Sequence, residues 1–274
     1  MRKINRRQRV LLGLGLSAVF LAAVCIWGSL GTEAARATDF SRKNIPPCLQ
    51  YPFGTDWLGR DMLVRTVKGL SMSIVIGITA AAVSAVIALL LGIASATMGK
   101  AVDSVVSFVI DLIMGVPHIL LLILISVAMG KGLKGVIVGV AVTHWPSLAR
   151  LIRAEVLQLK EMPYIKIAGK LGKSRGYIAV KHMLPHLLPQ FIVGLVLLFP
   201  HAILHESSIT FLGFGLSTEQ PAIGIVLSEA MKYLVTGKWW LALFPGLFLV
   251  VTVVLFYILG QSLRKLLDPG SVHQ

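Results

Sequence analysis

Two histidines and a glutamate lie close together in one strongly apolar stretch of the chain. The stretch reads VLLFPHAILHESSITFLGFGL and contains His201, His205 and Glu206. Residues four apart lie on the same face of a helix, so a helix here directs both imidazole rings to one side. Imidazoles are ligands that suit borderline divalent metals such as nickel, copper or zinc. The spacing therefore makes these three residues candidate ligands for a metal.

The apolar surroundings of these side chains add to the argument. An acid near the centre of a membrane helix costs roughly 2.5–3.5 kcal/mol on insertion scales, and ionisable groups there usually face a path or a partner. His144, in another apolar stretch, is a further candidate along the same path. His118, which follows Pro117, is a weaker candidate, and Asp111 is more typical of helix packing. Hydrogen bonds between helices are the alternative role for the histidines, and the sequence leaves both roles open.

Long apolar stretches must form the helices that hold these side chains. The 274 residues are 56% hydrophobic and 14% charged, with a mean hydropathy of +0.82, whereas soluble domains are about 25% charged. A helix crosses the hydrocarbon core with roughly 20 apolar residues. Six stretches reach or approach this length: 10–30, 69–99, 104–130, 135–149, 183–216 and 239–263. The sequence therefore predicts a multi-pass membrane protein with six transmembrane helices.

The N-terminal sequence MRKINRRQRV, followed by an apolar run, is also how a secretory signal begins. The apolar core of such a signal has about 7–15 residues. The stretch 10–30 is longer than that, so we expect a retained helix.

The distribution of Lys and Arg predicts the orientation of the helices. The segments 1–9, 99–103, 148–182 and 264–274 hold 16 Lys and Arg in 60 residues, against 10 in 67 for the segments 31–69, 130–134 and 216–238. Basic residues favour the cytoplasmic side, so both termini are expected in the cytoplasm. The net charge of +14 then reflects this bias and does not indicate nucleic-acid binding.

The segment 150–185 is the longest one expected in the cytoplasm. Apolar residues at helical spacing predict that the helix from 135 continues past the membrane surface, and Pro163 interrupts that pattern. A short helix is expected over 165–171, ending near Gly172. Attraction of this basic segment to anionic lipid is the simplest role for it.

Gly172, Lys173 and Ser174 match the end of the phosphate-binding loop G-x-x-x-x-G-K-[ST]. That loop requires a glycine where this chain has Ile167, a buried strand before it and a helix after it. No strand-rich segment is present in the sequence. The chain is therefore not expected to bind nucleotide itself.

The same segment resembles the cytoplasmic loop of permease subunits of ATP-driven (ABC) importers, which runs E-A-A-x-x-x-G, nine residues, then I-x-L-P. Four positions match, namely Ala168, Gly172, Leu184 and Pro185. Three depart from it, because Lys166, Ile167 and His182 stand where Glu, Ala and Ile are usual. The resemblance implies that the short helix near 165–172 couples the membrane helices to an ATPase.

Further stretches narrow the resemblance to the peptide/nickel/opine-type importer permeases. Their G-T-D-x-x-G-R-D signature is present as Gly54, Thr55, Asp56, Gly59, Arg60 and Asp61. SSITFLGFGL resembles their S-F-L-G-x-G stretch, with Thr210 in place of Ser, and Leu267–Pro269 matches their L-D-P end. The likeness covers about 53–269 in the right order.

The resemblance implies an all-α membrane protein with the type I ABC importer permease fold. Its expected parts are an N-terminal helix and outside loop (1–69), a permease core (70–268) and a tail (269–274). The expected partners are a second homologous permease, two cytoplasmic ATPases, an external substrate-binding protein and the lipid bilayer, with no nucleic acid. The chain itself is then not an enzyme, and its place is the cytoplasmic (inner) membrane of a bacterium or archaeon.

The sequence and the resemblance leave several cargoes open. The histidines in HWPSLARLIR and in H-x-x-L-H resemble nickel-type members, which implies transport of nickel or another transition metal, free or chelated, and no resident cofactor. A di- or oligopeptide importer permease is the alternative within the family. An ion-driven carrier or a channel is the alternative outside it. A membrane enzyme is disfavoured, since di-iron enzymes need several H-x-x-x-H boxes and H-E-x-x-H is absent.

Overall fold

The computed structural model describes residues 6–267, and this part of the chain is all helical, without a strand. The prediction of an all-α fold is confirmed. The residues 1–5, most of the L-D-P match and the tail 269–274 lie outside the described part. The elements are α1 (Arg6–Leu30), the 3-10 turn η1 (Phe40–Arg42), α2 (Met62–Thr97), α3 (Lys100–Gly115), α4 (His118–Ala128), α5 (Gly132–Lys160), α6 (Pro163–Lys170), α7 (Arg175–Ile178), the π-helical turn η2 (Ala179–Met183), α8 (Leu184–Phe211), α9 (Ile223–Leu234) and α10 (Trp240–Leu267).

Five single helices (α1, α2, α5, α10 and the run 176–211 that ends in α8) are long and apolar enough to cross a membrane. The sixth predicted span, 104–130, is instead the pair α3 and α4, which meet at a bend of 99°. Pro117 causes the break, because it has no N–H and disfavours helical backbone at the residue before it. Val116 accordingly has extended backbone, with ψ of 138°. Six spans are therefore present only when this bent pair counts as one.

The helix α2 is the centre of the bundle and packs against α1, α5, α8, α9 and α10. Its small residues permit this, since Ala80, Ala81 and Ala85 are fully buried. A Cβ atom at Gly92 would lie 2.9 Å from the carbonyl oxygen of Ala149 in α5. Small residues let membrane helices approach closely, where packing rather than the hydrophobic effect holds them together.

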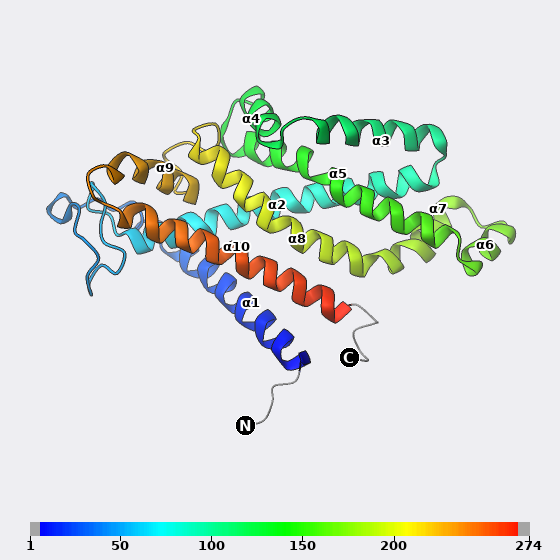
Figure 1. Ribbon diagram of the computed structural model, residues 1–274, viewed down its shortest axis with the longest axis horizontal. Helices are drawn as coiled ribbons and strands as arrows, with labels where there is room; N and C mark the ends of the chain where they lie inside the picture. Colours follow the sequence, from blue (N-terminus) through cyan, green and yellow to red (C-terminus); the bar gives the residue numbers. More distant parts are fainter. Residues whose placement is uncertain (1–5, 268–274) are drawn as a thin grey trace.

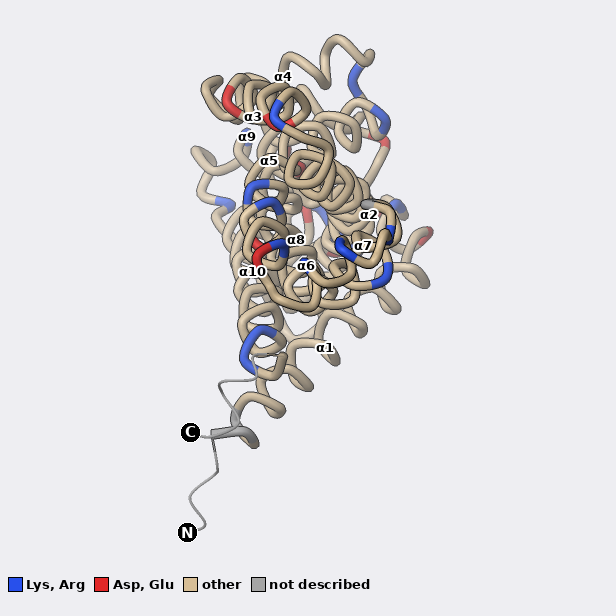
Figure 2. Tube along the Cα trace, turned by 90° about the vertical axis from the view of Figure 1, so that its right-hand side faces the viewer, with Lys and Arg blue, Asp and Glu red and all other residues tan. Residues whose placement is uncertain are grey.

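The molecule is elongated, and its two ends differ (Figure 1). The loop between α1 and α2 lies with α9 at one end, whereas α6 and α7 lie at the opposite end. Figure 2 shows Lys and Arg gathered around the α6 and α7 end. This charge distribution agrees with the predicted orientation, in which the α6 end faces the cytoplasm.

A buried ion-pair network fixes the loop end. Asp56 is fully buried and accepts from Arg60 Nε and from Arg65 Nη1, at 2.6 Å each. Glu229 of α9 accepts from Arg65 Nη2 at 2.8 Å, and Trp57 stacks on Tyr233 of α9 with ring centroids 4.4 Å apart. The network joins the outside loop, the start of α2 and α9.

The other signature residues shape this loop. Gly54 and Gly59 have positive φ angles of 70° and 74°, which favour glycine. The Asp61 side chain caps α2 by accepting from the backbone N–H groups of Leu63 and Val64. The sequence does not predict the helix α9, because 216–238 is expected only as an outside segment. Its 12 residues are too few to span, so hydropathy over long windows misses it.

The network predicts a large loss of stability for Asp56→Asn. The change leaves the Arg65 guanidinium, 4% exposed, with one carboxylate partner fewer, and breaking a buried pair costs about 3–5 kcal/mol. We expect a clearly lower midpoint of thermal unfolding for the detergent-purified protein. The control is Asp39→Asn, whose ion pair with Arg42 is about half exposed and should contribute little. Equal midpoints for the two variants would contradict the structural role of Asp56.

Candidate functional site

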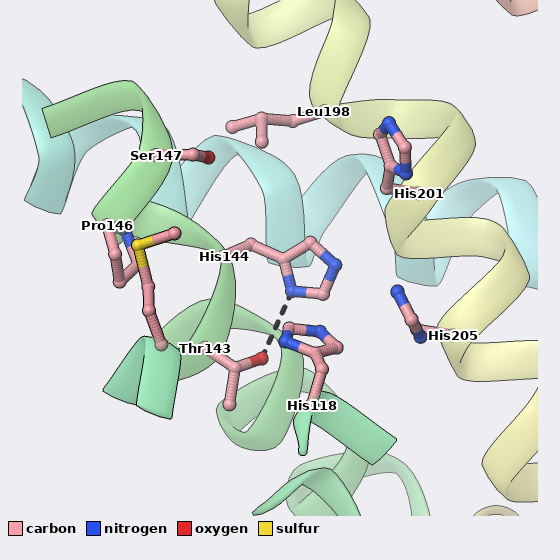
Figure 3. Close-up of a pocket in the computed structure, with 9 residues that line it drawn as sticks. His118, Thr143, His144, Pro146, Ser147, Leu198, His201 and His205 are labelled. Carbon is pink, nitrogen blue, oxygen red and sulfur yellow. Dashed lines mark hydrogen bonds between the residues drawn. The ribbon is translucent and has the colours of Figure 1, made fainter. Parts of the chain in front are cut away.

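Three imidazole rings from three different helices converge inside the bundle. His118 begins α4, His144 lies in α5 and His205 lies in α8. The ring centroid of His118 lies 4.7 Å from that of His144 and 4.4 Å from that of His205. The ring centroids of His144 and His205 are 5.1 Å apart. One nitrogen atom from each ring lies within 4.8 Å of the other two. Figure 3 shows the three rings turned toward one another.

Hydrogen bonds fix the orientation of His144. Its Nδ1 lies 2.9 Å from the carbonyl oxygen of Val140 and 3.1 Å from Oγ1 of Thr143. A carbonyl oxygen only accepts, so Nδ1 carries the proton and Nε2 keeps its lone pair. Among the described residues, this Nε2 is buried without a hydrogen-bond partner, and so is Nε2 of His118. Two buried ring nitrogens therefore remain free at the cluster.

The break at Pro117 brings His118 to this place. Because α3 ends at Gly115 and α4 begins at His118, the bend turns the first residue of α4 toward α5 and α8 (Figure 3). A continuous helix over 104–130 would carry this side chain elsewhere on its surface. The signal for His118 in the sequence is Pro-His in the middle of an apolar stretch, which makes it a weaker candidate than His144, His201 and His205.

A cavity of about 250 Å³ lies against the cluster. Its walls are formed by α3, α4, α5 and α8, and its lining residues are Met114, His118, Thr143, His144, Pro146, Ser147, Leu198, His201 and His205. His201 is exposed at its edge, one turn of α8 away from His205. The cavity therefore gives small molecules or ions access to the buried His144 ring and to the half-buried rings of His118 and His205.

The sequence predicts four candidate residues along the translocation path, and the structure places them in different positions. His144 and His205 join the cluster, and His201 lines the cavity without joining it. Glu206 is fully buried and lies in neither. Its carboxylate accepts hydrogen bonds from Ser207 at 3.2 Å and Thr210 at 3.0 Å, and from Ser73 of α2. The geometry assigns Glu206 to helix packing between α8 and α2.

An ion pair lies beside the cavity on the side of α6. Asp111 of α3 accepts from the Arg150 guanidinium of α5, and both side chains are about half exposed. Asp111 precedes the cavity residue Met114 by one turn, and Arg150 follows His144 toward the cytoplasmic end of α5. The pair links α3 to α5, which is the packing role that the sequence favours for Asp111. Neither side chain lines the cavity, and each charge is engaged by the other.

The predicted coupling segment contains a short helix, α6 (Pro163–Lys170), close to the one expected over 165–171. Ile165 is buried against the bundle, whereas Ile167 is 56% exposed. Gly172 has a φ angle of 77°, and Lys173 N–H donates to the Ala168 carbonyl at 3.2 Å, which is how glycine commonly ends a helix. This arrangement leaves one apolar face of α6 exposed at the end of the molecule.

The remaining residues of the predicted coupling motif lie around this helix. Leu184 and Pro185 begin α8. Lys166, which stands where Glu is usual, pairs with Glu161 at 2.7 Å. This hydrogen bond from Lys166 lowers the pKa of Glu161. The charge of Lys166 is thus engaged within the chain.

Comparison with known proteins gives a consistent result. Residues 73–272 match the model of the family described as binding-protein-dependent transport system inner membrane component. The dipeptide transport system permease protein DppC of Bacillus subtilis is 31% identical over 268 residues, which are 98% of this chain and 84% of that protein. The oligopeptide transport system permease protein OppC of the same species is 34% identical over 84% of this chain and 77% of its own length. The glutathione transport system permease protein GsiD of Pectobacterium atrosepticum is 32% identical over 96% and 88%.

A solved ABC transporter structure shares the fold. It shows inward-facing conformations of the MetNI methionine ABC transporter, with a TM-score of 0.58 and 19% identity. The match covers 76% of this chain and 98% of that one.

The placement of Glu206 predicts that its hydrogen bonds matter and its charge does not. Glu206→Leu removes the acceptor of three hydroxyl groups, and a buried donor left unsatisfied costs about 1–3 kcal/mol. Glu206→Gln keeps the shape and a carbonyl acceptor, so its midpoint of thermal unfolding should stay near that of the unchanged protein. If the Gln variant is as unstable as the Leu variant, an ionised carboxylate is required and this assignment fails.

Proposed function

This chain belongs to the family of binding-protein-dependent transport system inner membrane components, and from that premise we propose that its cargo is a short peptide or a molecule of similar size and charge. The chain is a multi-pass inner-membrane permease subunit of an ABC importer. Such subunits are not catalytic, since ATP hydrolysis belongs to partner subunits. They work with a second permease, ATPases and a substrate-binding protein.

The observation that carries the peptide proposal is the similarity to dipeptide and oligopeptide permeases along nearly the whole chain. These names favour the peptide alternative over nickel, and the finer likeness to nickel-type permeases is not supported by them. The site is compatible with such a cargo. Asp111 and Arg150, which are paired with each other in this structure, lie one helical turn from the cavity residues Met114 and Ser147. A peptide with free ends carries an ammonium and a carboxylate that would replace the partner of each charge.

A transition-metal cargo, free or chelated, is the second candidate. The specific observation in its favour is the convergence of His118, His144 and His205. Imidazole suits nickel, copper and zinc. In this case the metal is cargo, and the chain holds no resident cofactor.

Two long helices connect the coupling segment to the cavity. The helix α5 carries His144 and continues to Lys160, next to α6, and α8 carries His205 and begins directly after η2. With a rise of 1.5 Å per residue, His144 lies about 24 Å from the end of α5. A displacement of α6 by an ATPase would therefore move both walls of the cavity as rigid bodies, as expected for alternating access.

The end of α6 generates a prediction about coupling. Gly172→Val places a branched residue at a φ of 77°, which costs roughly 1–2 kcal/mol and corresponds to about 5–30-fold less of the native turn. We expect less ATPase to copurify with the permease and lower transport, at an unchanged amount of protein in the membrane. Gly176→Val is the matched control, because Gly176 has open space around it and no positive φ. Normal transport by the Gly172 variant would contradict the coupling role of α6.

The cargo proposal is tested in a cell that lacks its other peptide and nickel importers and expresses this permease with its partners. We expect uptake of a dipeptide that supplies a required amino acid, and its loss in the Gly172→Val variant. Accumulation of radioactive nickel is measured in the same cells. Nickel uptake that falls at least tenfold in His205→Gln, without dipeptide uptake, would replace the peptide proposal by the metal candidate. Uptake of neither would contradict both.

A further inference from the structure

We propose that His118, His144 and His205 form a binding site for one divalent transition-metal ion. The site goes beyond the cargo assignment above, because it stands on the geometry of this chain and not on which molecule is carried. An ion bound there would link α4, α5 and α8. It would do so at the point where these helices enclose the cavity.

The distances are close to those of an occupied site. Metal–nitrogen bonds of about 2.0–2.1 Å in tetrahedral geometry place the ligand nitrogens roughly 3.4 Å apart. The three nitrogens lie within 4.8 Å of one another, so shifts of the rings by roughly 1 Å complete the contact. The three residues come from separate helices, so the sequence spacing alone does not show the site.

The hydrogen bonding also fits a set of ligands. In metal sites, a ligating histidine usually donates its other ring nitrogen to a carbonyl or carboxylate, which fixes the tautomer. His144 does this through Nδ1 to the Val140 carbonyl. Its Nε2 and that of His118 are buried without a partner among the described residues. A metal ion would accept an electron pair from each of these two nitrogens.

The ligand types define the class of metal. The set contains three imidazoles and no carboxylate, which suits nickel, copper, cobalt or zinc and excludes magnesium and calcium, because these prefer oxygen. Three protein ligands leave a fourth position open for exchange. The cavity lies at that position, and His201 stands at its edge, one turn before His205. His201 is therefore placed to receive an ion from the site or to deliver one to it.

The protein supplies the ion with no carboxylate ligand among the described residues. Neutral imidazoles do not offset the charge of the ion, and the carboxylate beside the cavity, that of Asp111, is engaged by Arg150. The carboxylate of Glu206 in α8 is buried and is engaged by hydroxyl groups. The site thus has three neutral ligands and no anionic one among the described residues, as do zinc sites with three histidines, in which the fourth position exchanges.

The test uses the assembled importer, purified without metal and reconstituted in lipid nanodiscs. Equilibrium dialysis against nickel measures binding, and the absorption spectrum with cobalt reports the number of nitrogen ligands. We expect the unchanged complex to bind one ion more than the triple variant His118→Gln, His144→Gln, His205→Gln. Each single Gln variant should bind at least tenfold more weakly. His201→Gln should keep the stoichiometry and change the exchange rate.

His186→Gln, at the cytoplasmic end, is the matched control and should bind as the unchanged complex does. Midpoints of thermal unfolding show whether each variant is folded. If a variant does not fold, the cobalt spectrum of the unchanged complex decides, since coordination without imidazole nitrogen overturns the proposal. Equal stoichiometry in the unchanged complex and the folded triple variant overturns it too. Because binding is measured without transport, this outcome is separate from the uptake experiment.

Discussion

The structure depends on one constraint, which is that backbone polar groups in a membrane must find partners within the protein or in enclosed water. The break between α3 and α4 violates the continuous hydrogen bonding of a spanning helix, so it must lie where lipid does not reach. A second cavity of about 440 Å³ lies along this break and is lined by 113–118 and Thr143. The break in the helix and the cavity therefore lie at the same place. His118 lies at their boundary because α4 begins there.

The two ends of the molecule hold the helices in different ways. At the outer end, buried charges around Asp56 tie the loop to α2 and α9. At the opposite end, α6 is held mainly by Ile165, and its outer face is exposed. Close contact between small residues of α2 and α5 joins these ends. The bundle thus has an outer end held by buried charges and an inner end where α6 has an exposed apolar face.

Much of the fold follows from the sequence, because long apolar stretches report directly on membrane spans. The site follows only in part. Spacing correctly places His201 and His205 on one side of α8, but Glu206 is about 100° further around the helix and faces α2. His118 of the cluster comes from α4, and no local sequence pattern shows that α4 lies beside α5 and α8. The G-T-D-x-x-G-R-D signature marks the outside loop, yet its role as a buried ion-pair network appears only when Glu229 of α9 is in place.

The π-helical turn η2 has a consequence for the whole of α8. Such a turn accommodates one extra residue in a helix, and one residue corresponds to about 100° of rotation. The turn of five residues, Ala179–Met183, therefore sets the angular phase of everything that follows it. The direction in which His201 and His205 point therefore depends on the backbone hydrogen bonds of η2, which lies near the cytoplasmic end, many residues before these two histidines. This one turn therefore determines the rotation of α8 about its axis, and with it the side of the helix on which each of its side chains lies.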